Sequence, residues 1–262
     1  MAKIEQTGTM AWFNLDTVPG NDISSDIIYD SQAAEVYVCG TSDRNGSYDL
    51  LLTAYESSGA QQWITTRDYQ ALADVGAVIN KDGSYLMING SSQSSQAQWD
   101  IVSWRYTMAG VFVGEQRNTG LNAASDELKD GALNNGYIHL TGTSTQGTHN
   151  DFKVVCLDAN NNFLWQHSYD KNGLEDQGNA LVPITNGFVA TGFVTPTAAN
   201  ENILIHKYDL NGNVLWNAEI DENGGNDRGI DIIEDPEGNY LVLADVEIND
   251  QTDVYLYYFE GT

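Results

Sequence analysis

The chain has 262 residues, 41% of them hydrophobic, which is enough for the core of one large all-β domain or two small ones. Eleven basic residues against 37 acidic ones give a formal net charge of −26, so nucleic acid and anionic membrane surfaces would be repelled. Such a surface suits cations, cationic protein patches, uncharged glycans, or simply solubility in salty surroundings.

Cysteine usage and hydropathy exclude two further classes. Cys39 and Cys156 are far apart and form no C-x-x-C pattern, so neither a disulfide framework nor a zinc site is indicated. The N-terminal residues contain no apolar run of signal-peptide length, and no segment approaches the roughly 20 apolar residues of a membrane span. We therefore expect no membrane insertion, although a trimmed secretion signal would leave no trace.

A period of 51 residues runs through the chain, beginning at Trp12. The first set of equivalent positions is Trp12, Trp63, Gly114, Trp165 and Trp216. Four residues before each of them stands a residue suited to a tight hairpin, namely Gly8, Gly59, Gly110, Asn161 and Gly212. Two more sets with this spacing are Asp49, Asp100, Asp151, Asn202 and Asp253, and Asp74, Ser125, Asp176 and Asp227. The chain is therefore an internal repeat.

Each period reads as four short strands. In residues 176–220 these are "DQGNALVPI", "GFVATGFV", "NILIHKYD" and "NVLWNAEI", separated by Gly, Asn, Asp or Pro. No segment shows a convincing 3.6-residue apolar period, so no helices are expected. Four antiparallel strands in 40 to 50 residues are typical of a β-propeller blade. The sequence predicts a single five-bladed β-propeller over residues 1–262.

The two ends of the chain predict how the ring closes. Residues 8–16, "GTMAWFNLD", are equivalent to a fourth strand, and residues 227–262 supply three strands of the last blade. The N-terminal strand is therefore expected to complete the last blade and to leave no open edge. Residues 3–8, "KIEQTG", also align with "KYDLNG" at 207–212, which indicates either ends cut from a longer chain or an ordinary frayed N-terminus.

Three segments carry a family resemblance: "YDLNGNVLWNAEI", "NDRGIDIIEDPEGNYLVLA" and "LDANNNFLWQHSYD". They resemble the propeller repeats of secreted and cell-surface bacterial proteins, especially those of the Bacteroidota. The resemblance covers essentially the whole chain and departs most at Gly114 and Ser125. The resemblance implies the propeller fold and secretion, but it indicates little about the function.

A D-x5-D spacing recurs in loops on one face of the predicted propeller. Two of these loops, "DKNGLED" and "DENGGND", offer the oxygen ligands that calcium prefers. The candidate calcium ligands are Asp170, Asn172, Asp176, Asp221, Asn223 and Asp227. In the alternative interpretation, Asp and Asn cap these turns through hydrogen bonds to the backbone.

The second set of loops on that face supplies candidate ligand contacts. Trp99 follows the amide-rich stretch "SSQSSQAQ", and an aromatic ring beside amides is typical of a sugar-binding platform. Packing at a blade edge is the alternative for Trp99. Tyr48 and His149, in the corresponding loops of the first and third blades, are the other candidates.

A glycosidase would need two or three carboxylates at the channel mouth, and Asp74, Asp176 and Asp227 are expected near it. These residues occupy a repeated position, which favours a repeated structural role, so we name no catalytic residue. The four histidines share no spacing typical of a metal site or a triad, and no phosphate-binding loop is present.

These patterns predict a non-catalytic extracellular binding or display module, whose acidic, loop-rich face recognises protein or glycan partners, with calcium as a candidate cofactor. Two alternatives stay open. One is a glycan-active hydrolase with carboxylates at the channel mouth, and the other is a structural spacer in a larger surface protein.

Overall fold

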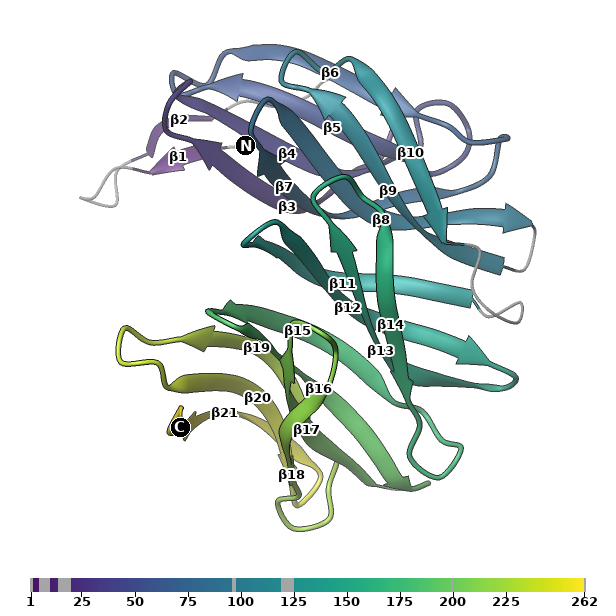
Figure 1. Ribbon diagram of the computed structural model, residues 1–262, viewed down its shortest axis with the longest axis vertical. Helices are drawn as coiled ribbons and strands as arrows, with labels where there is room; N and C mark the ends of the chain where they lie inside the picture. The colour runs from purple at the N-terminus through teal and green to yellow at the C-terminus, as the bar shows by residue number, and fades with distance from the viewer. Residues whose placement is uncertain are drawn as a thin grey trace. The chain divides into compact units, whose positions relative to one another are not determined.

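The computed structural model describes residues 2–4, 10–13, 20–95, 98–118, 125–198 and 200–261. These residues form β-strands joined by turns, and none of them is helical (Figure 1). Within this described part there is accordingly no helix with the length and hydropathy to cross a membrane. The chain divides into two compact units, which we call unit 1, Met1–Arg117, and unit 2, Asn118–Thr262.

Unit 1 contains a short hairpin and two four-stranded sheets. The hairpin pairs β1 (Ala2–Ile4) with β2 (Met10–Phe13). Blade 1 consists of β3 (Asp22–Asp30), β4 (Glu35–Ser42), β5 (Asp49–Glu56) and β6 (Gln61–Arg67). Blade 2 consists of β7 (Asp74–Asp82), β8 (Tyr85–Ser95), β9 (Gln98–Thr107) and β10 (Phe112–Asn118).

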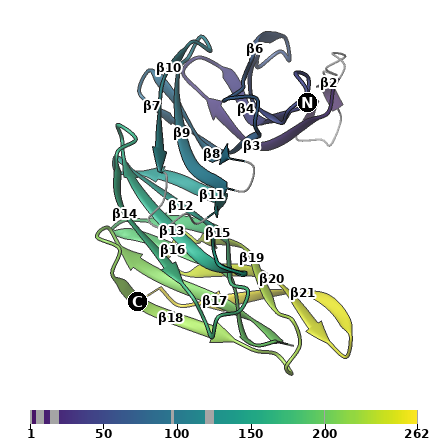
Figure 2. The same cartoon turned by 90° about the vertical axis from the view of Figure 1, so that its right-hand side faces the viewer.

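Unit 2 contains three sheets, and Figure 2 shows them in teal to yellow. Blade 3 consists of β11 (Ser125–Asn134), β12 (Tyr137–Gln146), β13 (His149–Asp158) and β14 (Phe163–Tyr169). Blade 4 consists of β15 (Gln177–Ile184), β16 (Gly187–Thr197), β17 (Asn200–Asp209) and β18 (Val214–Ile220). Blade 5 consists of β19 (Arg228–Glu234), β20 (Tyr240–Ile248) and β21 (Gln251–Phe259).

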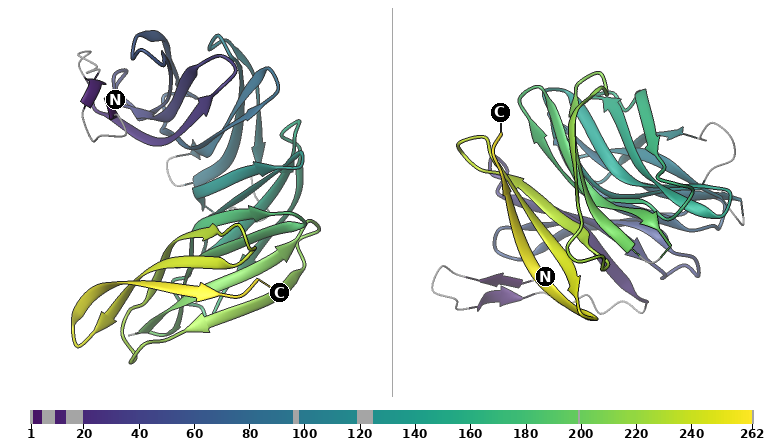
Figure 3. Two further views of the ribbon diagram at one scale, coloured as in Figure 1. Left: turned by 90° about the vertical axis from the view of Figure 1, so that its left-hand side faces the viewer. Right: turned by 90° about the horizontal axis from the view of Figure 1, so that it is seen from below.

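The prediction of an all-β chain with five antiparallel sheets is confirmed for the described residues. Four of these sheets have four strands and the last has three, so β21 is its edge strand (Figure 3). Closure of the ring is not shown, because β2 pairs with β1 and the described partner of β21 is β20. A single closed propeller over residues 1–262 therefore stays a prediction.

The hairpin "DLNGN" of residues 209–213 shows how an Asp fixes the start of a turn. The Asp209 carboxylate accepts hydrogen bonds from the backbone N–H of Asn211 and Asn213, both at 2.8 Å, and Gly212 takes the positive φ of 83° that the turn needs. The Asn213 side chain and these backbone groups hold the pKa of Asp209 below its ordinary value. The turn is thus fixed by charge-assisted hydrogen bonds.

Neighbouring blades within a unit pack through the repeated Trp residues and through small residues of their first strands. Trp165 donates its Nε1–H to the carbonyl of Leu210 at 3.0 Å and lies against Gly212 of the next blade. A Cβ on Gly178 or on Gly229 would come within about 2 Å of a threonine Oγ1 of the preceding blade. The first strands of blades 4 and 5 can therefore approach their neighbours only because they carry glycine there.

Candidate functional site

A cleft of about 620 Å³ opens between blades 3, 4 and 5, entirely within unit 2. Three carboxylates line it, from Glu175, Glu201 and Asp245, together with the cationic side chains of Lys129 and Arg228. Lys129 and Arg228 come from β11 and β19, which are first strands of their blades. The cleft is thus built where a propeller's channel is expected, although its acidic residues differ from those that we had predicted.

Arg228 organises the charge in this cleft. Its Nε and Nη2 groups both donate to the Glu201 carboxylate, the Nη2 bond being 2.8 Å long, and its guanidinium lies 4.9 Å from the centre of the Phe193 ring. Asp245 lies directly opposite Arg228 in the pairing of β19 with β20. The hydrogen bonds to Glu201 raise the pKa of Arg228 above its ordinary value. A two-bond pair of this kind fixes the orientation of the Glu201 carboxylate.

The other two carboxylates are less constrained. Glu175 is exposed, and its Oε2 accepts a hydrogen bond from the backbone N–H of Asn150 at 3.2 Å. Asp245 is half-buried. Among the described residues neither carboxylate takes part in an ion pair. Two amide side chains, of Gln177 and Asn179, complete the polar wall, and Asn179 donates to the carbonyl of Gly229 at 2.7 Å.

The predicted calcium residues of loop 170–176 act as caps of the turn. Asp170 Oδ1 accepts the backbone N–H of Gly173 at 2.7 Å. Asp176 accepts two more, from Lys171 at 2.5 Å and from Thr195 at 2.8 Å. Asn172 has φ of 65° and donates its amide to the carbonyl of Pro196 at 2.9 Å. The alternative interpretation of these residues therefore accounts for their contacts.

Loop 221–227 repeats the arrangement. Asp221 Oδ1 accepts the backbone N–H of Gly224 at 2.8 Å, and Asn223 has φ of 66°. Asp227 accepts the backbone N–H of Glu222 at 2.6 Å and that of Glu247 at 3.0 Å. The D-x5-D spacing is thus explained by the turn. The first Asp accepts a backbone hydrogen bond within the loop, and the second Asp accepts one from the loop and one from a neighbouring strand.

The carboxylates that the hydrolase alternative had placed at the channel mouth are fully buried. Asp74, Asp176 and Asp227 are each 0% exposed. Burial raises the pKa of Asp74 and of Asp176 to about 6, and it raises that of Asp227 as well. Because no substrate can reach them, these three residues are structural, and the accessible carboxylates of the cleft are different ones.

The structure does not bring the three predicted ligand contacts into one site. Tyr48 is 47% exposed and Trp99 is half-buried at the start of β9, both in unit 1. His149 belongs to unit 2, where its Nε2 lies 3.5 Å from Asp151 Oδ1 and 4.0 Å from Asp170 Oδ1. His149 therefore meets one of the predicted calcium ligands, a proximity that the separate predictions did not foresee.

The cleft residues that we missed carry a signal in the sequence, namely departure from the repeat. Glu201 occupies the position of Tyr48, Trp99, Asn150 and Thr252 in the other blades. Arg228 replaces Gln177 of the preceding blade, and Asp245 replaces its Val194, both 51 residues earlier. A charged residue at a position where the preceding blade has an uncharged one would have pointed to Glu201, Arg228 and Asp245.

A comparison of the sequence with family models and with curated proteins gives no match. Solved structures do match. A subtype N10 neuraminidase-like protein of A/little yellow-shouldered bat/Guatemala/060/2010 is 12% identical with a TM-score of 0.54, covering 92% of this chain and 80% of that one. The Bacillus subtilis arabinanase Arb43A is 14% identical with a TM-score of 0.45, covering 90% and 95%. The GH43 β-xylosidase/α-arabinofuranosidase CoXyl43 from a compost microbial metagenome, in a calcium-free complex with xylotriose, is 7% identical with a TM-score of 0.45, covering 98% and 95%.

At these identities the likeness shows a fold, the β-propeller, and no sequence family. The special resemblance to repeats of the Bacteroidota therefore stays a prediction. The functional prediction of a non-catalytic binding or display module is corrected: several of the matched structures are glycoside hydrolases by name, which agrees better with our alternative, a glycan-active hydrolase. Nothing in the comparisons supports a protein partner.

Proposed function

We propose that this protein is a glycan-active hydrolase whose substrate binds in the cleft of unit 2. The observation that carries the proposal is the presence of three accessible carboxylates in one cleft of about 620 Å³. That volume lies within the range of about 300 to 1,000 Å³ that small-molecule sites occupy. Glycoside hydrolysis needs a pair of carboxyl groups beside the scissile bond, one to donate a proton and one to act as base or nucleophile.

The surroundings of the three carboxylates suggest different roles. Glu201 is paired with Arg228, and Asp245 lies opposite Arg228 in the sheet. Both carboxylates are therefore close to the same positive charge. We assign the base or nucleophile to Glu201, because its two hydrogen bonds from Arg228 fix the orientation of its carboxylate. Glu175 has acidic neighbours instead, since its charge contributes to the raised pKa of Asp151. We assign proton donation to the leaving group to Glu175.

The charge balance favours an uncharged glycan. The net charge of the chain is −26, and the cleft holds three acidic against two basic side chains. Both basic side chains already have a carboxylate partner, since Arg228 pairs with Glu201 and Lys129 with Glu127 at 3.9 Å. An anionic sugar would therefore be repelled on approach.

A hydrolysis screen on neutral aryl glycosides and oligosaccharides tests the proposal. On a substrate that is turned over, Glu175→Gln and Glu201→Gln should each lower kcat by roughly 10²- to 10⁴-fold, the usual contribution of a positioned acid or base. Glu237→Gln, an exposed residue of the turn between β19 and β20, is the matched control and should leave kcat unchanged. Turnover that survives in both cleft variants would overturn the assignment.

We further propose that calcium binds at loop 221–227 and that the protein acts outside the cell. The support for calcium is the oxygen-rich composition of this loop, and the support for the location is the resemblance to secreted repeats together with the acidic surface. A melting temperature that does not change between excess calcium and excess chelator would contradict the calcium proposal.

A further inference from the structure

Three donor atoms of blade 3 converge at the beginning of β13. His149 and Asp151 are two residues apart on this strand, so their side chains lie on the same face of the sheet. Asp170 follows β14 and reaches the same place from the loop. His149 Nε2 is 3.5 Å from Asp151 Oδ1 and 4.0 Å from Asp170 Oδ1, and the three donor atoms lie within 4.8 Å of one another.

One of these donors is buried and has no hydrogen-bond partner. Asp151 is only 4% exposed, and among the described residues nothing donates a hydrogen bond to its Oδ1, the atom that faces His149. A buried carboxylate oxygen beside a second carboxylate is costly unless a cation compensates it.

The next blade shows what this position looks like without an imidazole. The residues 51 positions later are Asn200, Asn202 and Asp221, and the Asn200 amide donates to Asp221 Oδ2 at 3.3 Å. That contact is an ordinary hydrogen bond between an amide and a carboxylate. Blade 3 replaces the first amide by a metal-binding imidazole and the second by a carboxylate on the same backbone.

We propose that His149, Asp151 and Asp170 bind a divalent transition-metal ion of the zinc type. Tetrahedral zinc with ligands at about 2.0 to 2.2 Å places its donor atoms roughly 3.3 to 3.6 Å apart. The 3.5 Å between His149 Nε2 and Asp151 Oδ1 matches this range, and the exposed Asp170, at 4.0 Å, would move closer on binding. Calcium fits these residues less well, because it takes six to eight oxygen ligands. His149 and Asp170 are partly exposed, so the fourth position of the ion is open to water.

Such an ion would brace the loop that carries Glu175. Asp170 begins loop 170–176, and His149 and Asp151 belong to the strand beneath it. The backbone N–H of Asn150, between these two ligands, already donates to Glu175 at 3.2 Å. The metal would therefore join the loop to β13 at a second point. The inference does not depend on the hydrolase proposal, because it rests on blade 3 alone.

Metal titration of the full chain, first treated with chelator, tests the inference. Calorimetry with ZnCl₂ should show one equivalent bound, and CoCl₂ should give the visible absorption of a low-coordinate site. His149→Asn and Asp151→Asn introduce the residues of blade 4, so they should fold while weakening zinc binding by roughly 100-fold or more. Circular dichroism without metal checks that they fold.

His167→Asn removes an exposed histidine of the same blade and is the control. It should bind zinc as the wild type does. The inference is wrong if the wild type binds no stoichiometric zinc or cobalt, if His149→Asn and Asp151→Asn bind as tightly as the wild type, or if His167→Asn is the variant that loses binding. None of these readouts involves glycan hydrolysis, so the two proposals can fail separately.

Discussion

The two units share one repeat but arrange their charged side chains differently. In unit 1 the arginines are locked: Glu115 accepts hydrogen bonds from Arg67 at 2.8 Å and from Arg117 at 3.0 Å, and these guanidinium groups lie 3.6 Å and 3.5 Å from the rings of Phe112 and Tyr69. In unit 2 the acidic residues Glu175, Glu201 and Asp245 line an accessible cleft. One backbone pattern thus supports a closed ionic network in one unit and an open polar site in the other.

This difference shows that the side chains which depart from the repeat are the ones that give each blade its own surface. The hollow of unit 1, about 350 Å³ on the first blade, is lined by Asp22 and Asp26 with Ile27, Leu51 and Tyr55, and Asp22 is already paired with Arg44. It offers fewer accessible charged groups than the cleft of unit 2. We therefore expect catalysis to depend on unit 2 and stability to depend on both.

The largest expected effect separates the two units by activity. Glu201→Gln should lower kcat on a turned-over glycan by roughly 10²- to 10⁴-fold, whereas Glu115→Gln in unit 1 should leave kcat unchanged, because only Glu201 lies in the cleft. Steady-state kinetics of both variants measures this. An equal loss of kcat from the two substitutions would end the functional distinction between the units.

The next effect concerns the packing of blade on blade. A Cβ at residue 178 or 229 would lie 2.0 or 2.1 Å from a threonine Oγ1, whereas at residue 76 the nearest atom is a flexible Leu50 Cδ1 at 2.6 Å. Gly178→Ala and Gly229→Ala should therefore lower the free energy of unfolding by about 1 to 3 kcal/mol, and Gly76→Ala by less. Urea denaturation measures these differences. Gly114→Ala, with no atom within 4 Å of the new Cβ, is the control.

A third substitution tests how much the locked network contributes to stability. Although burial opposes it, the hydrogen bonds from Arg117 and Arg67 hold the pKa of Glu115 below its ordinary value. Glu115→Gln removes the charge from between two arginines and should cost about 2 kcal/mol of the free energy of unfolding. Chemical denaturation measures it, and the cost should shrink at high salt. A variant as stable as the wild type would show that the network is only a surface feature.

The smallest effect should be common to both units. Asp74 in unit 1 and Asp176 in unit 2 each have a pKa raised by burial to about 6, above the ordinary 3.8. The native state therefore binds protons more readily than the unfolded state, and stability falls as the pH rises from about 4 through 6. Lowering the pH from 7 to 5 should add about 1 kcal/mol for each group. Thermal melts of the wild type and of Asp74→Asn and Asp176→Asn measure it: the variants should show a weaker pH dependence.

Much of the fold was accessible from the sequence, because the repeated residues are those that shape turns and blade contacts. The predicted strands 176–184 and 213–220 correspond to β15 (Gln177–Ile184) and β18 (Val214–Ile220). A residue with positive φ recurs at Gly59, Gly110, Asn161 and Gly212, since each hairpin needs one. Closure between the two ends, which residues 8–16 predict, stays a prediction, because β2 pairs with β1 and the described partner of β21 is β20.

The candidate site was much harder to predict. The acidic residues that recur, such as Asp176 and Asp227, proved to be buried caps, and the same regularity that made them visible reflects their structural role. Glu201 occupies the same position of the repeat as Trp99, yet we predicted a ligand contact only for Trp99, because of its residue type. Which departures from the repeat meet in a cleft depends on how three successive blades pack, and a single sequence does not contain that information.

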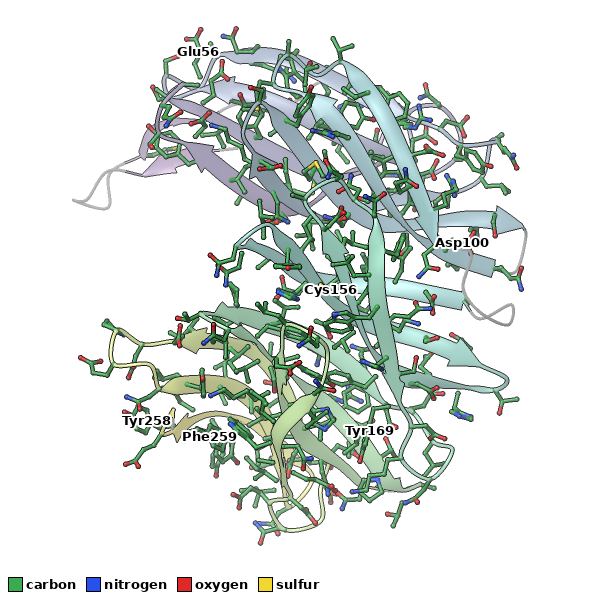
Figure 4. All side chains as sticks on the ribbon, viewed as in Figure 1. Glu56, Asp100, Cys156, Tyr169, Tyr258 and Phe259 are labelled. Carbon is green, nitrogen blue, oxygen red and sulfur yellow. The ribbon has the colours of Figure 1, made fainter. Side chains whose placement is uncertain are left out.

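Blade 5 ends on a strand whose outer face is apolar. Val254, Leu256 and Tyr258 of β21 are 74%, 65% and 57% exposed, while Phe259 turns inward to the core (Figure 4). An edge strand offers backbone donors and acceptors to any extended segment of suitable pattern. With no described strand on its other side, β21 is therefore the place where we expect the protein to self-associate at high concentration.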